Sequence, residues 1–548
     1  MKSRISNKFL VVFAMAMCAS LIVVASLTGC ASEKLTASGP YPNKLAESAV
    51  ISDQYKEIAN SLSESAIDEF LAITKIPRET AHMDSIRNYI MNWANTNGKK
   101  ATLDSSGCIY IDVPASAGHE KDKNLILQAH MDMVVTIDPS YTNFDKNTTG
   151  IDAVYDKEAG IIYSRDRKTS LGADDGEGLG LCLAIAKNET KFEHGPIRLL
   201  FTYDEETTMD GAKKLSADVI NADYLINFDN SPCGFAATSS AGILPIEFTK
   251  KYPTAAPTEK GMSQNMTFKI DGLKGGHAGT DINKGNASAS AILTKYLNEL
   301  TDKKVHFRIV SIDCGQAHNA IPTNMTLTLN INKKHEEEAR QAFEDVCNQT
   351  KKESPNDSEM NSEITVTDAS GMFPSQQDSE KIQNILNCLP NGIIEKDAKY
   401  KDVVSKSCNI GIVRFSDGQL YVRASYRSSD NQDIQDQRNT IAQDLKALKI
   451  DWQVSDDAIN PAWPESDSKI AKVYEKAMKD ECKITPTLTS IHAALETAPF
   501  VIKKPGLQVV SIGGDVANEH TTNETFYTKT FPVAIVPVLY ILDHVNEL

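Results

Sequence analysis

Short apolar runs that alternate with helical patterns constrain the fold of this chain most strongly. The runs at 124–134 (NLILQAHMDMV), 196–206 (PIRLLFTYDEE) and 223–229 (DYLINFD) have the length and composition of buried strands. Between the first two, DGEGLGLCLAIAKNE (175–189) predicts a helix that opens after a glycine-rich turn. Strands that alternate with helices predict an α/β domain whose largely parallel sheet is covered on both faces.

The sequence pattern changes after residue 245. NMTFKIDGL, VHFRIVSIDCG and NMTLTLNINK alternate apolar and polar residues, which is typical of half-exposed antiparallel strands, and two helical segments lie among them. The segments LQVVSIGGD (507–515) and FPVAIVPVLYILDHV (531–545) then return to the first pattern. We therefore predict a first domain made of residues 59–245 and 457–548, with an α+β domain (246–456) inserted into it.

The N-terminus has the pattern of an export signal. MKSRISNKF carries three basic residues, LVVFAMAMCASLIVVAS is apolar without a charge, and LTGC ends at Cys30. The alternative is a transmembrane anchor, but the run is at the short end of the roughly 20 residues that a span needs. LTGC resembles the bacterial lipobox, which implies that residues 1–30 are a lipoprotein signal and that Cys30 carries lipid. Residues 31–58 then form a polar tether, and the protein is anchored in the cell envelope, outside the cytoplasm.

Charge and cysteine content narrow the function. The net charge of −16 disfavours nucleic acid and anionic lipid as partners and suits a soluble enzyme or a cation-binding protein. Apart from Cys18 and Cys30, the cysteines are scattered and form no CxxC pair. Neither a disulfide framework nor a cysteine zinc site is indicated.

Side chains that bind metals follow three of the predicted strands. His130 and Asp132 end the first, Glu205 and Glu206 the second, and Asp229 the third. Each of these residues alone also fits an ordinary loop, turn or solvated strand end. Ligands bind at the carboxyl ends of strands in open parallel sheets, so their convergence there favours a shared site.

Two further segments offer ligands to the same edge. Asp174 and Asp175 lie in the turn LGADDG, and His520 follows the late strand in SIGGDVANEH. Two histidines with several carboxylates suit zinc, with manganese or cobalt as alternatives. Two ions roughly 3.5–4 Å apart need a bridging carboxylate, for which Asp174 is the natural choice. Residues i and i+2 of a strand face the same side, so Asp132 can orient the imidazole of His130.

These motifs, in this order, resemble the co-catalytic zinc peptidases of the aminoacylase and dipeptidase superfamily, and most of all its Xaa-His (carnosinase-like) dipeptidases. The likeness extends from about residue 60 to 548 through LILQAHMDMV, TSLGADDGEG, FTYDEETTMDGA, LKGGHAGTD, NAIP, YRSS, IHAALE and SIGG…EH. It implies a zinc-peptidase catalytic domain with an inserted lid, and two metal ions. By this resemblance, His130 and Asp229 bind one ion, and Glu206 and His520 bind the other. Asp174 bridges the two ions. Asp132 orients His130, and Glu205 is the general base.

The resemblance also suggests substrate contacts from the lid and from the second part of the catalytic domain. His277 in GGHAG matches a histidine that stabilises the oxyanion, although a turn histidine is the plain alternative. Arg427 is a candidate for the substrate carboxylate because a guanidinium matches it with two hydrogen bonds, unless it forms a surface ion pair. Asn319 is a second candidate for the carboxylate, and Glu496 is a candidate for the amino group.

The sequence departs from the family pattern beside two of the ligands. NSPCG follows Asp229 where acidic residues are usual, and EHTTNE replaces a more usual His-Ser-Pro around His520. The first hypothesis for function is an exported dipeptidase for unblocked Xaa-His dipeptides, with a homodimer implied by resemblance only. The alternatives are a tripeptidase or N-acyl-amino-acid deacylase on the same scaffold, and a non-catalytic peptide-binding lipoprotein.

Overall fold

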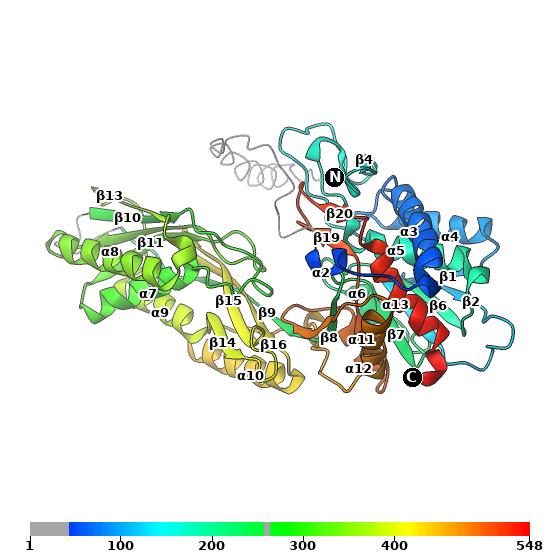
Figure 1. Ribbon diagram of the computed structural model, residues 1–548. Coiled ribbons are helices and arrows are strands. Elements are labelled where there is room, and N and C mark those ends of the chain that lie inside the picture. The colour runs from blue at the N-terminus through cyan, green and yellow to red at the C-terminus, as the bar shows by residue number, and fades with distance from the viewer. Residues whose placement is uncertain (1–42, 257–263) are drawn as a thin grey trace, which may run out of the picture. The chain divides into compact units, whose positions relative to one another are not determined.

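In the computed structural model, the catalytic domain is organised by an eight-stranded sheet with the order β1-β2-β6-β3-β7-β18-β8-β17 (Figure 1). Strands β6, β3, β7 and β18 are parallel to one another, as the apolar runs predict, and β2 pairs antiparallel with β6. The carboxyl ends of these four strands therefore meet at one edge. The strands are β1 (Ala101–Leu103), β2 (Ile109–Val113), β3 (Leu125–His130), β6 (Ile197–Thr202), β7 (Tyr224–Asn227), β8 (Phe235–Ser240), β17 (Thr487–Ile491) and β18 (Gln508–Ser511).

The structure describes residues 43–256 and 264–548, nearly all in one unit from Leu45 to Leu548. The predicted lipoprotein signal with Cys30, and the first part of the predicted tether, lie outside the described residues. Within the described ranges, no helix has both the length and the apolar character that a membrane span requires.

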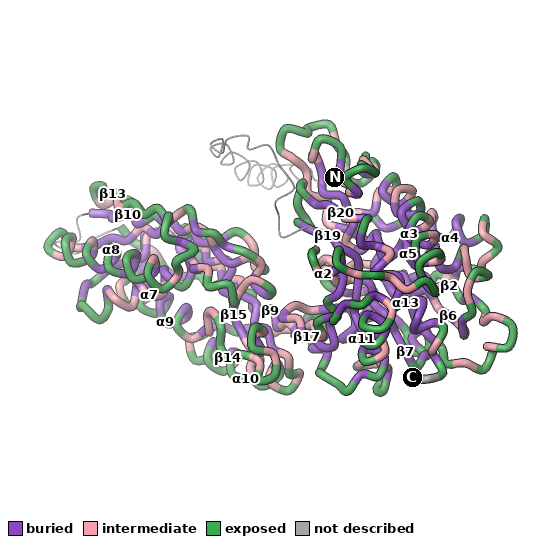
Figure 2. Tube along the Cα trace, viewed as in Figure 1, coloured by how far each residue is buried: buried purple, intermediate pink, exposed green. Residues whose placement is uncertain are grey.

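Helices bury both faces of this sheet, since alternate side chains of each strand point to opposite sides. Leu127, Leu199 and Ile226 belong to a hydrophobic cluster with helices on one face, whereas Ile126 and Leu200 belong to a separate cluster on the other. Figure 2 shows the buried strands between helices with exposed outer surfaces. The first face is covered by α3 (Asp53–Ile73), α5 (Ala173–Lys187), α11 (Lys469–Glu481) and α13 (Phe531–Asp543), and the second by α6 (Asp210–Lys214) and α12 (Thr497–Lys503). Helix α4 (Asp84–Thr96) packs beside β1.

The inserted domain is built on an antiparallel sheet with the order β13-β10-β12-β11-β15-β16-β9, and β14 pairs with β15. This sheet begins at Gly242, four residues before the predicted boundary, and its hydrophobic core extends to Ala462. Its strands are β9 (Gly242–Lys251), β10 (Gln264–Asp271), β11 (Phe307–Cys314), β12 (Met325–Ile331), β13 (Asn361–Asp368), β14 (Gly392–Lys396), β15 (Val404–Ser416) and β16 (Gln419–Ser428). Its helices are α7 (Ala289–Asp302), α8 (Glu336–Glu353), α9 (Gln376–Cys388) and α10 (Asn431–Ala447).

A small four-stranded sheet, absent from the sequence prediction, carries the His520 loop. Its order is β19-β20-β5-β4, with β4 (Ala153–Asp156), β5 (Ile161–Ser164), β19 (Asp515–Ala517) and β20 (Thr525–Tyr527). The connection from β19 to β20 contains His520. Pairing of β20 with β5 brings this late loop to a segment that precedes Asp174 in the chain.

The predicted tether is wrong over its last part. Helix α2 (Lys44–Glu47) and the start of α3 lie within residues 31–58, and both Ala46 and Tyr55 are buried. The hydroxyl of Tyr55 donates to the carboxylate of Asp543 at 3.3 Å, so this segment is part of the catalytic domain. The segment was missed because polar residues surround a single narrow apolar stripe.

Eight cysteines lie in the described part of the chain, and none of the eight is in a disulfide. Only Cys388 is partly accessible. Burial raises the pKa of the Cys182 and Cys233 thiols well above the ordinary value, which makes both poor nucleophiles. These cysteines therefore contribute to packing.

Candidate active site

The predicted ligands converge at the carboxyl edge of the parallel strands. His130 is the last residue of β3, and Asp229 follows β7 by two residues. Glu205 and Glu206 lie in the turn after β6. The closeness of these residues follows from the parallel pairing of β3 with both β6 and β7.

The carboxylate of Asp174 lies between two histidines from opposite ends of the chain. Its Oδ1 is 3.0 Å from Nε2 of His130, and its Oδ2 is 3.0 Å from Nε2 of His520. A carboxylate that offers one oxygen to each of two ligand sets has the geometry of a bridge between two metal ions.

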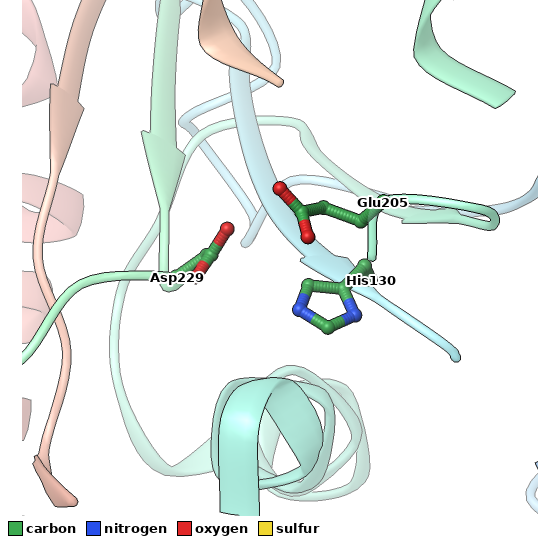
Figure 3. Close-up of side chains that lie close together, drawn as sticks. All are labelled: His130, Glu205 and Asp229. Atoms are coloured by element: carbon green, nitrogen blue, oxygen red, sulfur yellow. The ribbon is translucent and has the colours of Figure 1, made fainter. Parts of the chain in front are cut away.

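The adjacent glutamates have different neighbours. Glu206 Oε2 is 3.0 Å from Nε2 of His520, and its side chain is almost fully buried. Glu205 instead groups with His130 and Asp229, whose potential ligand atoms all lie within 4.8 Å of one another. Figure 3 shows these three side chains turned toward a common space. The geometry separates the two glutamates, but Glu205 is near enough to bind a metal ion as well as to move a proton.

Asp132 organises two segments at once. Nδ1 of His130 lies 3.1 Å from the backbone carbonyl oxygen of Asp132, while the nearer carboxylate oxygen is at 3.6 Å. The carboxylate accepts hydrogen bonds from the Thr80 hydroxyl at 2.9 Å and from the backbone N–H groups of Glu205 and Glu206 at 3.3 and 3.4 Å. Asp132 therefore orients His130 mainly through its carbonyl, and it holds the turn that carries both glutamates.

The electrostatics of the site indicate a need for cations. Burial and the charge of Asp229 raise the pKa of Glu205 well above its ordinary value, and burial and Asp174 do the same to Asp229. Burial would lower the pKa of His520, but its hydrogen bonds with Asp174 and Glu206 raise it to about 12. Bound divalent ions would replace these protons and satisfy the carboxylates.

The donor set fits divalent metal ions. A second group of potential ligand atoms, from His130, Asp174 and Glu206, also lies within 4.8 Å of one another. Imidazole nitrogens and carboxylate oxygens in this number are typical of zinc and of other first-row metals. His130, Asp174, Glu205, Glu206, Asp229 and His520 are thus the residues that could hold two ions.

A cavity of about 720 Å³ opens over this group. Its walls include Glu205, Glu206 and Asp229 on the catalytic side, and His277, Asn319 and Arg427 on the lid side. Sites for small molecules typically enclose roughly 300–1,000 Å³. The structure thus brings the predicted lid residues to the cavity that contains the predicted ligands.

Two lid residues, His277 and Arg427, have N–H groups that can donate to a negatively charged ligand in the cavity. Nδ1 of His277 accepts the backbone N–H of Thr280 at 3.2 Å, which leaves the proton of the neutral ring on Nε2. Burial and the charge of Arg427 lower the pKa of His277 to about 4, so the ring is neutral at pH 7. Arg427 is buried, and its Nε and Nη1 have no hydrogen-bond partner among the described residues. An unpartnered buried guanidinium that lines a cavity suits an anionic ligand.

The prediction that Glu496 contacts the substrate is wrong. Glu496 is fully buried and is not part of the cavity wall. Its Oε2 accepts hydrogen bonds from Nε2 of Gln128 at 2.8 Å and from the hydroxyl of Thr202 at 2.5 Å. The residue occupies the N-cap position of α12 without a side-chain capping bond, and its carboxylate is directed to Gln128 and Thr202 and not to the cavity.

Two buried ionic residues that the sequence analysis missed hold the start of α5. The carboxylate of Glu524 accepts the backbone N–H groups of four successive residues, 171–174, at 2.7–3.3 Å. Nη1 of Arg78 donates to the carbonyl oxygens of Met131 and Asp132 at 3.0 and 2.7 Å, and Nη2 donates to that of Gly172. In the sequence, Glu524 could have been noticed only as an acidic residue four positions after His520.

The two departures noted in the sequence both lie at the cavity. Asn230 and Ser231 line it, and their side chains are fixed by backbone carbonyls of Ser511 (3.1 Å) and Val516 (2.8 Å). The His520 loop is held by the Thr136 hydroxyl, which donates to the His520 carbonyl oxygen at 2.7 Å. Despite the unusual loop sequence, His520 reaches Asp174 and Glu206.

Comparison with known proteins agrees with this geometry. Residues 126–543 match the peptidase family M20/M25/M40. The chain belongs to this family and is a metallopeptidase. It is 28% identical over 472 residues to the cytosol non-specific dipeptidase of Escherichia coli K12, covering 84% of this chain and 94% of that protein. It also resembles the crystal structure of the aminoacylhistidine dipeptidase of Vibrio alginolyticus, with a TM-score of 0.73 and 25% identity, covering 87% of this chain and 96% of that one. The family resemblance and the fold class inferred from the sequence are thus confirmed.

Proposed function

We propose that this protein is a dipeptidase that hydrolyses the peptide bond of unblocked dipeptides, with Xaa-His dipeptides as its preferred class. The position of Asp174 between His130 and His520 carries the proposal, because a carboxylate with one oxygen near each histidine is placed as a bridge between two ions would be. The names of the Escherichia coli and Vibrio alginolyticus relatives support the dipeptide class, and the second supports histidine at the carboxyl side.

The metal ligands in this proposal are His130 and Asp229 for one ion, Glu206 and His520 for the other, and Asp174 for both. Zinc is the proposed metal, since the donors are imidazole and carboxylate. When bound, the two ions lower the pKa of a water molecule and polarise the scissile carbonyl.

The chain's own residues supply proton transfer and orientation. The carboxylate of Glu205 takes the proton of the attacking water and delivers it to the nitrogen of the leaving amine. The Nε2–H of His277 donates a hydrogen bond to the oxygen that becomes negative in the transition state. The guanidinium of Arg427 binds the substrate's terminal carboxylate, which accounts for its buried, unpartnered N–H groups.

A substrate panel with matched ions tests the proposal. The truncated chain, which lacks residues 1–30, is assayed with zinc, manganese or cobalt. The substrates are Xaa-His dipeptides, other dipeptides, tripeptides and N-acetyl amino acids. We expect the highest kcat/KM on an Xaa-His dipeptide and a large loss when its amino group is acetylated. Faster turnover of tripeptides or N-acetyl amino acids would replace the dipeptidase proposal by one of those activities.

We further propose that the enzyme is a lipoprotein of the bacterial cell envelope, anchored through Cys30. The support is the basic, apolar and LTGC pattern of residues 1–30. Full-length protein should label with fatty acid, and Cys30→Ser should not. Equal labelling of both forms would contradict the anchor.

A homodimer, proposed from resemblance alone, would be tested by light scattering of the truncated chain.

A further inference from the structure

A row of buried polar side chains crosses the parallel strands just below the metal-binding residues. Thr202 of β6, Gln128 of β3, Asn227 of β7 and Ser511 of β18 are all fully buried. Two residues earlier, each strand carries an apolar side chain of one hydrophobic cluster: Leu200, Ile126, Leu225 and Val509. Because strand side chains alternate, the four polar residues share the face of this cluster. We call these four residues, together with Glu496, the polar row.

The hydrogen bonds of the polar row run in one direction. The Ser511 hydroxyl donates to Oδ1 of Asn227 at 2.5 Å, and Nδ2 of Asn227 donates to Oε1 of Gln128 at 2.6 Å. Nε2 of Gln128 donates to Oε2 of Glu496 at 2.8 Å and to the Thr202 hydroxyl at 3.1 Å. The Thr202 hydroxyl donates to Oε2 of Glu496 at 2.5 Å. Glu496 is therefore the final acceptor, and it fixes the orientation of both amide groups.

The row is adjacent to the ligands in sequence but does not contact the substrate cavity. Gln128 precedes His130 by two residues, and Asn227 precedes Asp229 by two residues. Ser511 Oγ is also 3.4 Å from the carbonyl oxygen of Asp229. None of the row's side chains is part of the cavity wall. The row is thus placed to position ligands and not to bind a peptide.

Stability alone does not explain such a row. Replacing both partners of a buried hydrogen bond by apolar groups of the same shape can be nearly neutral. A hydrogen-bonded polar network instead specifies one arrangement of the groups that it joins, and in this row Oε1 of Glu496 is the one atom of the final acceptor that has no partner among the described residues. Metal sites and near-attack geometries are sensitive to displacements of about 1 Å.

We propose that the polar row is a positioning network that fixes the ends of β3 and β7, and through them His130 and Asp229, for one of the two metal ions. The proposal rests on the proposed function for the assignment of these two ligands. It adds Gln128, Asn227 and Glu496 as positioning residues outside the cavity.

The first experiment separates positioning from plain stability. Gln128→Leu and Asn227→Leu are made in the full chain, with Asn330→Leu as the matched control. Asn330 is an equally buried amide of the lid that donates to Gln264 and Asn265 at 3.0 and 2.9 Å. The measurements are Tm without metal, zinc affinity by chelator competition, and kcat and KM.

We expect zinc affinity and kcat of the two row variants to fall about 10- to 100-fold, which is typical when a residue that orients a metal ligand is removed. KM should change less than about threefold. Asn330→Leu should lose a similar amount of Tm but keep zinc affinity and kcat. Row variants with wild-type zinc affinity and kcat would overturn the proposal. So would an equal loss in Asn330→Leu, because that would identify a general effect of destabilisation.

A charge-conserving exchange provides the second test. Gln128→Glu places a second carboxylate against Glu496, and we expect it to lower zinc affinity about tenfold. Glu496→Gln keeps one oxygen that can accept from Gln128, so its loss should be smaller. The double variant restores one amide donor and one carboxylate acceptor, so most of the affinity should return. Additive losses in the double variant would overturn the proposal. Zinc affinity does not depend on the substrate, so a chain that cleaves no dipeptide but follows this pattern would refute the proposed function alone.

Discussion

The two glutamates after β6 cannot be distinguished by their sequence, yet their surroundings differ. Glu206 lies against His520, and its Oε1 also accepts the backbone N–H of Val134 at 3.3 Å. Glu205 belongs to the group with His130 and Asp229 and lines the cavity. A turn held by the Asp132 carboxylate sends the two side chains to different partners. One glutamate is therefore available to hold metal while the other moves a proton.

Glu205→Gln tests this division at the residue scale. The amide keeps the shape of the side chain but cannot take a proton, so kcat should fall about 10²- to 10⁴-fold. Metal content should remain at two ions per chain, measured by elemental analysis after dialysis. Glu206→Gln is the matched comparison and should lose bound metal as well as activity. Glu205→Gln protein that retains most of its activity on every dipeptide would show that Glu205 is not the base.

Arg427 is the residue whose replacement should change substrate selection. Arg427→Lys loses the two-pronged carboxylate contact, and kcat/KM for a dipeptide should fall about 10- to 100-fold. A dipeptide amide, which has no terminal carboxylate, should be hydrolysed equally by wild type and variant. Arg423→Lys is the control, because Arg423 lines the same cavity but pairs with Glu247 at 3.4 Å. If Arg427→Lys affects the dipeptide and its amide equally, the carboxylate contact is wrong.

At the scale of the element, the first turn of α5 depends on a residue from the far end of the chain. Glu524→Ala would leave four backbone N–H groups, three of them buried, without their acceptor. At about 1–3 kcal/mol for each buried group, the cost is at least about 3 kcal/mol. Because Asp174 belongs to this turn, metal affinity should fall about tenfold or more along with Tm. Glu524→Gln retains one acceptor oxygen and should lose less of both quantities.

The control for the Glu524 variants is Glu69→Ala. Glu69 is also buried, and it accepts hydrogen bonds from Trp93 and Lys187 at 2.8 and 2.7 Å, away from the site. This variant should lower Tm without changing metal affinity. A Glu524→Ala protein that binds metal like the wild type would show that the turn keeps its shape without this carboxylate.

The histidines around Arg427 predict how stability depends on pH. Burial and Arg427 lower the pKa of His492 to about 3 and that of His277 to about 4. Between pH 6.5 and 4.5 the unfolded chain binds protons at these residues that the folded chain does not bind. The contribution of these two histidines to stability is therefore complete above pH 6.5 and decreases as the pH falls through this window, by about 1–3 kcal/mol for His492 alone.

His492→Gln should weaken this dependence. The amide can still hydrogen-bond the Ser407 hydroxyl, which lies 2.7 Å from Nε2 of His492, but it does not titrate. The decrease in Tm between pH 6.5 and 4.5, measured by calorimetry on the truncated chain, should be smaller in the variant than in the wild type. Identical slopes would show that His492 is not buried as a neutral ring.

The sequence predicts elements better than it predicts their contacts. The runs that contain His130, Glu205 and Asp229 predict β3, β6 and the position after β7, because a buried strand needs a continuous apolar run. Strands β4, β5, β19 and β20 have only three or four residues and show no such pattern. Glu524 and the polar row were missed for another reason: their partners lie up to 368 residues away, and only the folded chain brings them together.

At the scale of the whole molecule, chelation tests how the two ends of the chain are joined. His520 meets Asp174 and Glu206 across more than 300 residues, and metal ions would cross-link these segments. Saturation at about 1,000 times Kd stabilises a protein by about 4 kcal/mol, so EDTA should lower Tm by roughly 5 °C and abolish activity, both reversibly. Asp174→Asn is the control and should show little response, because its bridging carboxylate is gone. An unchanged Tm and activity of the wild type in EDTA would contradict a two-metal site.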